Sequence, residues 1–183
     1  MCKKRLSAII FVMLAGYMLP AMSEYYVGVD YYAFNTVMKN NNVDTGFYGN
    51  QQRIRVGYRG YYVGFEMDLL SNQDDTNASG FLNYKVGPAL GAYMLLHGEW
   101  FYGKVGALRT DTTLKSVTSG VTADDTLLQF SAALGVEFEV AENLFINADY
   151  TYSNGSGNYS NILGADNPNI TSQALAAGFK FSF

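Results

Sequence analysis

The sequence alternates between apolar and small or polar residues with a period of two along much of its length. Residues 129–140 do so without exception. Their even positions are Phe130, Ala132, Leu134, Val136, Phe138 and Val140, and their odd positions are Gln129, Ser131, Ala133, Gly135, Glu137 and Glu139. Successive side chains of a β-strand point to opposite faces, so this period indicates strands whose two faces meet different surroundings. The chain is therefore predicted to be all-β.

Alternation of this kind predicts eight strands. Their expected bounds are 25–34, 50–59, 61–70, 80–95, 100–111, 125–140, 144–153 and 171–183. Pro88 lies inside the fourth of these segments and has no backbone N–H to donate to a neighbouring strand. A local bulge is therefore expected at Pro88.

The connections between these strands are of two kinds. Three are short turns, at Gly60, at 97–99 and at 141–143, and four are long and polar, at 35–49, 71–79, 112–124 and 154–170. Short turns at one end and long loops at the other are typical of a bacterial transmembrane barrel. Because lipid offers no hydrogen bonds to a free edge, the sheet is expected to close into an antiparallel up-and-down barrel. Aromatic residues near the strand ends fit the two membrane interfaces: Tyr25, Tyr61, Trp100, Phe145, Tyr150, Tyr152 and Phe183.

The first 23 residues have the features of a secretory signal peptide. Lys3, Lys4 and Arg5 precede an apolar run of about 14 residues, too short for the roughly 20 of a spanning helix. Cleavage is expected between Ser23 and Glu24, which leaves a barrel domain of residues 24–183. The only cysteine is lost with the signal, and the net charge falls from −4 to −7. An acidic exported chain is a poor candidate for binding nucleic acid.

Four segments of the chain resemble a known family. The terminal segment 179–183, with Phe179, Phe181 and Phe183 alternating, resembles the signal by which outer-membrane barrels are recognised for assembly. Segments 26–30, 62–66 and 133–150 resemble the small OmpA-like and opacity-type barrels, also called the porin family. The resemblance implies an outer-membrane barrel of a Gram-negative bacterium. It implies contacts with outer-membrane lipid and lipopolysaccharide, and with the barrel-assembly machinery through Phe183.

Nine charged residues fall on the face predicted to point inward. They are Asp30, Arg53, Arg55, Glu66, Asp68, Lys104, Glu137, Asp149 and Lys180. An eight-stranded barrel is only wide enough for its side chains to fill, and unpaired buried charges are costly. A structural network of ion pairs is therefore the favoured interpretation, and a conducting, gated pore is the alternative.

No catalytic motif accompanies this pattern. Small barrels that deacylate or palmitoylate lipid A require a catalytic histidine, and His97, the only histidine, is expected in a turn. The sequence has no Gly-Xaa-Ser-Xaa-Gly motif, metal-ligand spacing or phosphate-binding loop. The chain is therefore predicted not to be an enzyme and to use no metal or cofactor.

The leading hypothesis is a structural or surface-interaction barrel whose long loops contact host, phage or neighbouring surfaces. One alternative is a narrow channel for small solutes or ions. Another is a soluble lipid-binding barrel, which requires Phe179, Phe181 and Phe183 to point inward. Two acidic pairs, Asp74–Asp75 and Asp124–Asp125, could bind divalent cations but are more simply solvated loop acids.

Overall fold

The computed structural model describes residues 24–40, 43–72, 76–77, 82–159 and 168–183, so the predicted signal peptide lies outside the described residues. Eight long strands dominate these residues, and a two-residue strand, β4 (Thr76–Asn77), accompanies them. The long strands are β1 (Glu24–Asn40), β2 (Val43–Arg59), β3 (Val63–Leu70), β5 (Leu82–His97), β6 (Phe101–Ser116), β7 (Thr122–Ala141), β8 (Leu144–Ser156) and β9 (Asn169–Ser182). In the described part of the chain no helix is long and apolar enough to cross a membrane.

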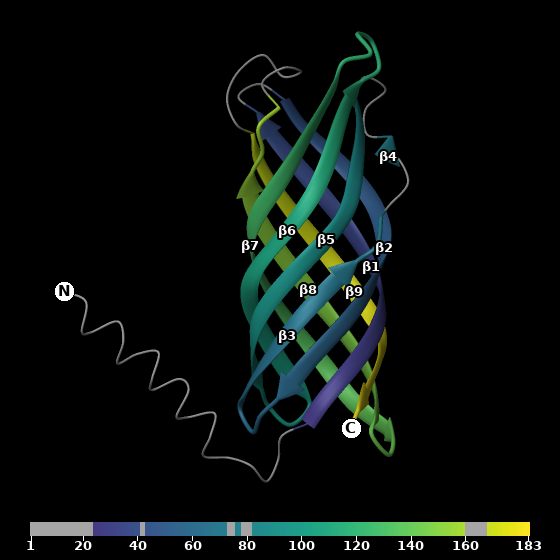
Figure 1. The fold of residues 1–183 in the computed structure, drawn as a ribbon, viewed down its shortest axis with the longest axis vertical. Coiled ribbons are helices and arrows are strands. Elements are labelled where there is room, and N and C mark those ends of the chain that lie inside the picture. Colours follow the sequence, from purple (N-terminus) through teal and green to yellow (C-terminus); the bar gives the residue numbers. More distant parts are fainter. Residues whose placement is uncertain (1–23, 41–42, 73–75, 78–81, 160–167) are drawn as a thin grey trace, which may run out of the picture.

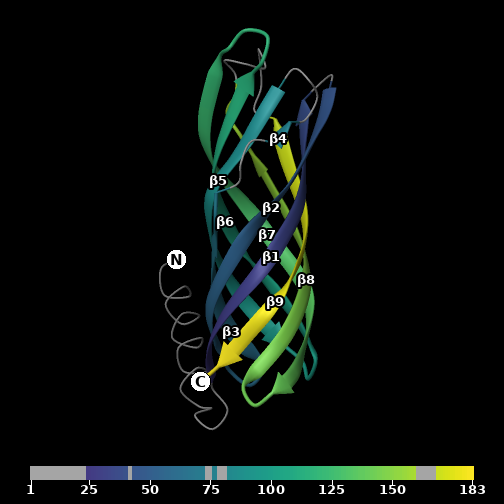
Figure 2. The same ribbon diagram turned by 90° about the vertical axis from the view of Figure 1, so that its right-hand side faces the viewer.

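The eight long strands close into an antiparallel ring. Each pairs with its neighbours in the order β3-β2-β1-β9-β8-β7-β6-β5, and β3 also pairs with β5 to complete the circle. The strands are steeply tilted (Figures 1 and 2). The chain leaves β9 at the end of the barrel that carries the tight turns, here called the turn end; the opposite end is the loop end. The predicted closed up-and-down barrel is confirmed.

The three tight turns lie close to where they were expected, although the second begins at Gly98 rather than at His97. They follow β2 at Gly60, β5 at Gly98, and β7 at Asn143, whose positive φ of 63° suits the left-handed position of a turn. The expected bulge is also present, because the pairing of β5 with β6 shifts register between Val86 and Ala89, on either side of Pro88.

The strands reach further toward the loop end than expected. Residues 35–40 and 43–49 were expected to be loop, but they pair with each other as β1 and β2. Residues 112–116 and 122–124 likewise continue β6 and β7, so only 117–121 connect them. The expected bounds of these two loops were therefore wrong.

A reversal of polarity along the strands explains this error. Near the turn end the outward side chains are apolar and the inward ones polar, as with exposed Val105 beside buried Lys104 on β6. Near the loop end the order is reversed, since Arg109 and Asp111 face outward while Leu108 and Leu114 are buried. An apolar exterior suits lipid and a polar exterior suits water, so the strands continue beyond the lipid.

On the loop-end side of this reversal of polarity, the interior of the barrel is an apolar core. Its buried side chains come from all eight long strands except β8, with one more from the segment after β8. They include Phe34 and Met38 of β1, Phe47 of β2, Leu70 of β3, Tyr84 of β5, Leu114 of β6, Leu127 of β7 and Ile170 of β9. The residue from the segment after β8 is Tyr159. The interior therefore has two layers, a polar one toward the turn end and an apolar one toward the loop end.

Candidate functional site: the charged interior

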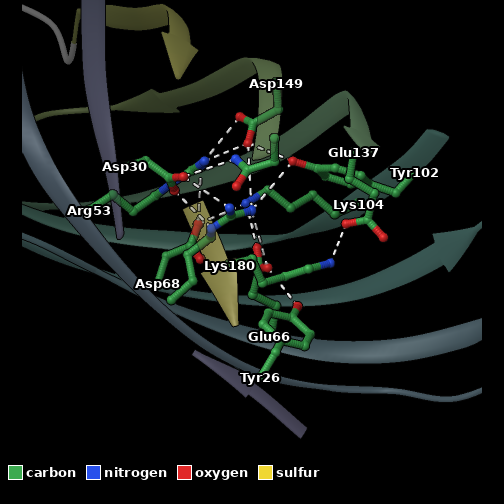
Figure 3. A network of polar contacts seen from close by, with 12 residues as sticks. Tyr26, Asp30, Arg53, Glu66, Asp68, Tyr102, Lys104, Glu137, Asp149 and Lys180 are labelled. Atoms are coloured by element: carbon green, nitrogen blue, oxygen red, sulfur yellow. Dashed lines mark hydrogen bonds and ion pairs between the residues drawn. The ribbon is translucent and has the colours of Figure 1, made fainter. Parts of the chain in front are cut away.

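All nine charged residues predicted to face inward lie inside the barrel, each at most 5% exposed. They come from seven of the eight long strands, β1, β2, β3, β6, β7, β8 and β9, and meet near the barrel axis (Figure 3). Seven of them form one central cluster, while Glu137 and Lys180 pair closer to the turn end.

Arg53 is the centre of the cluster. Its Nε donates to Oδ2 of Asp30 at 2.8 Å, and its two terminal nitrogens contact both carboxylate oxygens of Asp149, the shorter at 2.5 Å. Arg55, next on the same face of β2, donates from Nη2 to Oδ1 of Asp30 at 2.9 Å. Planar guanidinium groups suit such two-point contacts with carboxylates, so β1, β2 and β8 are tied together across the barrel.

Lys104 ties β6 to β3, the two strands on either side of β5. Its Nζ, on β6, donates to Oε1 of Glu66 at 2.7 Å and to Oδ2 of Asp68 at 2.8 Å, both on β3. Nζ of Lys104 also lies 4.5 Å from the ring centre of Tyr93, within the range of a cation–π contact. The ammonium group is thus fully buried, with two acids and one ring around it.

Two tyrosines complete the cluster, and the sequence analysis did not assign them to it. Tyr26 donates its hydroxyl to Oε2 of Glu66 at 2.7 Å, and Tyr102 donates to Oδ2 of Asp149 at 2.9 Å. Each ring lies against the glycine opposite it on the next strand, Gly57 for Tyr26 and Gly135 for Tyr102. Inward glycines paired with inward tyrosines across a strand pair were the available sequence signal.

A second, smaller group lies at the turn end. Glu137 accepts from Nη1 of Arg59 at 2.6 Å and also pairs with Nζ of Lys180. Phe145, expected at the outer rim, is only partly exposed, and its ring lies beside the Arg59 and Lys180 cations. Arg59 was not among the predicted site residues, although it follows Arg55 on the same alternating face.

His97 was expected in a turn, and this prediction was wrong. It is the last residue of β5, is 8% exposed, and its Nδ1 lies 3.9 Å from Oε1 of Glu137. Among the described residues neither ring nitrogen has a hydrogen-bond partner. The arrangement therefore lacks the serine and orienting contacts that a histidine-based hydrolase needs.

The loop end of the interior is covered by the segment after β8. Tyr159 is fully buried there, and its hydroxyl shares a hydrogen bond with Oγ1 of Thr112. Between this cover and the charged cluster lies an internal cavity of about 30 Å³, lined by side chains that include Tyr32, Gln51 and Thr110. Such a volume holds about one or two waters rather than a solute.

The remaining predicted residues lie outside the interior. Phe179, Phe181 and Phe183 are exposed on the outer wall, which opposes the soluble lipid-binding barrel. Asp74–Asp75 lie outside the described residues. Asp124 accepts from Thr113 and Asp125 from the backbone N–H groups of Thr126 and Asn158. No group of three or more metal-ligating side chains occurs within the described ranges.

Comparison with known proteins gives a family match over nearly the whole chain. The family model described as "Outer membrane protein beta-barrel domain" matches residues 8–183. None of the curated proteins matches the sequence.

Solved structures of similar shape are small barrels of bacterial outer membranes. Neisserial surface protein A is 19% identical, with 88% of this chain and 99% of that chain covered and a TM-score of 0.62. The attachment invasion locus protein Ail of Yersinia pestis is 18% identical, with 86% and 99% covered and a TM-score of 0.51. OprG of Pseudomonas aeruginosa is 14% identical, with 88% and 96% covered and a TM-score of 0.53. At these identities the likeness concerns the fold.

Proposed function

The chain belongs to the outer membrane protein beta-barrel domain family, and from this premise we propose that it is a closed, non-enzymatic barrel that acts through its loop end. In this proposal the lumen is a structural seal, and the hairpins beyond the lipid are the interacting surface. The observation that carries it is the central cluster, in which buried ion pairs from opposite walls meet across the barrel axis.

Charge balance supports the seal. When Arg59 is counted, five cations face five carboxylates: Arg53, Arg55, Arg59, Lys104 and Lys180 against Asp30, Glu66, Asp68, Glu137 and Asp149. Every one of the ten takes part in an ion pair. A conducting pore needs charged groups that face water, whereas these groups form ion pairs with one another.

The loop end supports the second half of the proposal. The strands extend past the lipid as a rigid stalk with its own apolar core, and β6 and β7 carry exposed Val117 and Val121 at their connection. Rigid elements that present loops are a common basis for recognition. Ail, one of the similar barrels, is named for attachment and invasion. We accordingly propose host, phage or neighbouring-cell surfaces as partners of the loop end, and the assembly machinery as the partner of Phe183.

Ion conductance of the refolded chain in a planar bilayer tests the proposal. A folded barrel that remains silent supports a seal. Stable, stepwise openings in the parent protein would refute it in favour of the narrow channel and make Arg53, Arg55, Glu66 and Glu137 the candidates for ion selectivity. Binding of the folded barrel to cells, with and without protease trimming of its loop end, tests the surface role separately.

A further inference from the structure

The internal cavity beneath the loop-end cover has polar groups in its wall that take no part in the charged cluster. Its volume is about 30 Å³, and a cavity needs about 10–15 Å³ to hold one water. Most of the wall is apolar, with Phe34, Leu108 and Leu127 among its residues. Two buried polar side chains also line it, Thr110 on β6 and Gln129 on β7, which are 6% and 3% exposed. The cavity is therefore a candidate site for one small polar molecule.

These two polar side chains lack a protein partner. Oγ1 of Thr110 and Nε2 of Gln129 are buried, and within the described residues neither atom has a hydrogen-bond partner. Leaving a buried donor or acceptor unpaired is costly, so native proteins satisfy such groups with protein atoms or with ordered water. The hydroxyls of Thr36 and Ser172 line the same cavity from β1 and β9 and lie 2.8 Å apart. Since one of them donates to the other, one hydroxyl proton of this pair is not used by their bond.

The strand register places Thr110 and Gln129 within reach of one bridging molecule. Thr110 pairs with Leu127, and Gln129 lies two residues further along the inward face of β7. Such diagonal neighbours on a strand pair lie about 7–8 Å apart, a separation that long side chains partly span. A water between the two side chains can accept from Nε2 of Gln129 and donate to Oγ1 of Thr110. The register therefore supplies two of the two to four polar partners that a buried water needs.

We propose that this cavity binds one water, which bridges Thr110 of β6 and Gln129 of β7. The hydroxyl pair of Thr36 and Ser172 supplies the third partner, which gives the number of hydrogen bonds that a buried water typically makes. No charged side chain is among the described residues that line the cavity, so the site suits a neutral molecule rather than an ion. The ion pairs of the seal include none of these four residues, and the inference therefore goes beyond the proposed function.

The position of this site explains why polar groups occur there. Toward the turn end the cavity is lined by Tyr32, whose ring centre lies 5.3 Å from Cζ of Arg53 in the charged cluster. Toward the loop end it is lined by Tyr84 and Leu127, which belong to the apolar core. The bridging water thus satisfies the polar side chains at the boundary between the two layers of the interior.

Crystal structures of the folded barrel, with and without xenon pressure, test the site directly. Electron density for one water within hydrogen-bond distance of both Gln129 Nε2 and Thr110 Oγ1 is expected, and xenon should not displace it. The double variant Thr110→Val, Gln129→Met makes this part of the wall apolar and should bind xenon in place of water, as dry apolar cavities do. Xenon in the cavity of the parent protein, or no density between the two side chains, overturns the proposal.

Urea unfolding in lipid vesicles tests the bridge by a second route. Thr110→Val and Gln129→Met should each lower the urea midpoint, because each removes a partner of the shared water. The double variant should lose clearly less than the sum of the two single losses. Thr112→Val combined with Gln129→Met is the control and should be additive, since Thr112 bonds to Asp125 and Tyr159 and is not among the described residues that line the cavity. Additive losses for Thr110 and Gln129 would overturn the bridge, even in a cavity that contains water.

Discussion

The ring of Tyr102 lies directly against Gly135, its register partner on the neighbouring strand. A Cβ built at Gly135 would come within 2.4 Å of the Tyr102 ring. The same tyrosine donates its hydroxyl to Asp149 at 2.9 Å. The missing side chain at position 135 therefore makes room for a ring that holds one of the buried carboxylates of the seal.

Gly135→Ala should displace Tyr102 and weaken its bond to Asp149. We expect a loss of about 1–3 kcal/mol in the free energy of unfolding, from overpacking and a poorly satisfied buried carboxylate. Urea unfolding in detergent or lipid vesicles measures it. Gly103→Ala, where the added Cβ makes only ordinary contacts, is the control and should stay within about 0.5 kcal/mol of the parent. Equal stability of the two variants would contradict the role given to Tyr102.

Arg55→Ala should destabilise the barrel strongly. It leaves Asp30 and Glu66 with fewer positive partners in a site closed to water, and breaking a buried pair in this way costs about 3–5 kcal/mol. The variant should also conduct more readily than the parent in a planar bilayer. Lys115→Ala, at an exposed position on the loop-end stretch of β6, is the control. If Arg55→Ala matches the parent in both stability and conductance, the central cluster is not a seal.

Neutralising Lys104 together with the two acids that it contacts should lower the free energy of unfolding much less than removing Lys104 alone. Lys104→Met alone leaves Glu66 and Asp68 with only their longer contacts, each of 3.6 Å, to Arg55 and Arg53, and the expected loss is about 3–5 kcal/mol. The triple variant Lys104→Met, Glu66→Gln and Asp68→Asn leaves Arg53 and Arg55 against Asp30 and Asp149, a balanced remainder. It should recover most of that loss. A triple variant no more stable than the single one would show that the cost is lost packing rather than unpaired charge.

The reversal of polarity along the strands predicts a depth-dependent cost for outward charges. Leu134→Lys places a cation in the apolar band of β7 and should cost about 2–4 kcal/mol, whereas Thr126→Lys, nearer the loop end of the same strand, should cost about 0–1 kcal/mol. Unfolding of both variants from lipid vesicles gives the comparison. Similar costs at the two positions would mean that the lipid boundary lies beyond Thr126.

Tyr159 should contribute to stability mainly through its ring. Tyr159→Phe removes the hydroxyl with its hydrogen bonds to Thr112 and Tyr84, an expected loss of about 1–2 kcal/mol, while Tyr159→Ala leaves a cavity over the apolar core and should cost about 3–5 kcal/mol. The two unfolding curves distinguish these effects. A small loss in Tyr159→Ala would mean that the cover over the core is easily displaced.

Much of the fold follows from the sequence because a strand's side chains alternate strictly. Lipid excludes charge, so residues such as Asp30 and Lys104 had to face inward and Val105 and Leu134 outward, whatever the register. The three tight turns and the bulge at Pro88 were predictable for a similar reason, since each depends on the backbone properties of a few neighbouring residues.

The tertiary structure alone decided which charges meet and how far the strands run. Pairs such as Arg53 with Asp149 join residues 96 positions apart, and their meeting depends on strand tilt and register, which alternation does not encode. The extent of β1 and β2 was missed because water replaces lipid outside them, so that polar residues face outward there and apolar ones inward. Arg59 was left out of the predicted network although alternation puts it on the face of Arg55. His97 was misjudged because the exact residue at which a strand ends depends on its pairing in the assembled sheet.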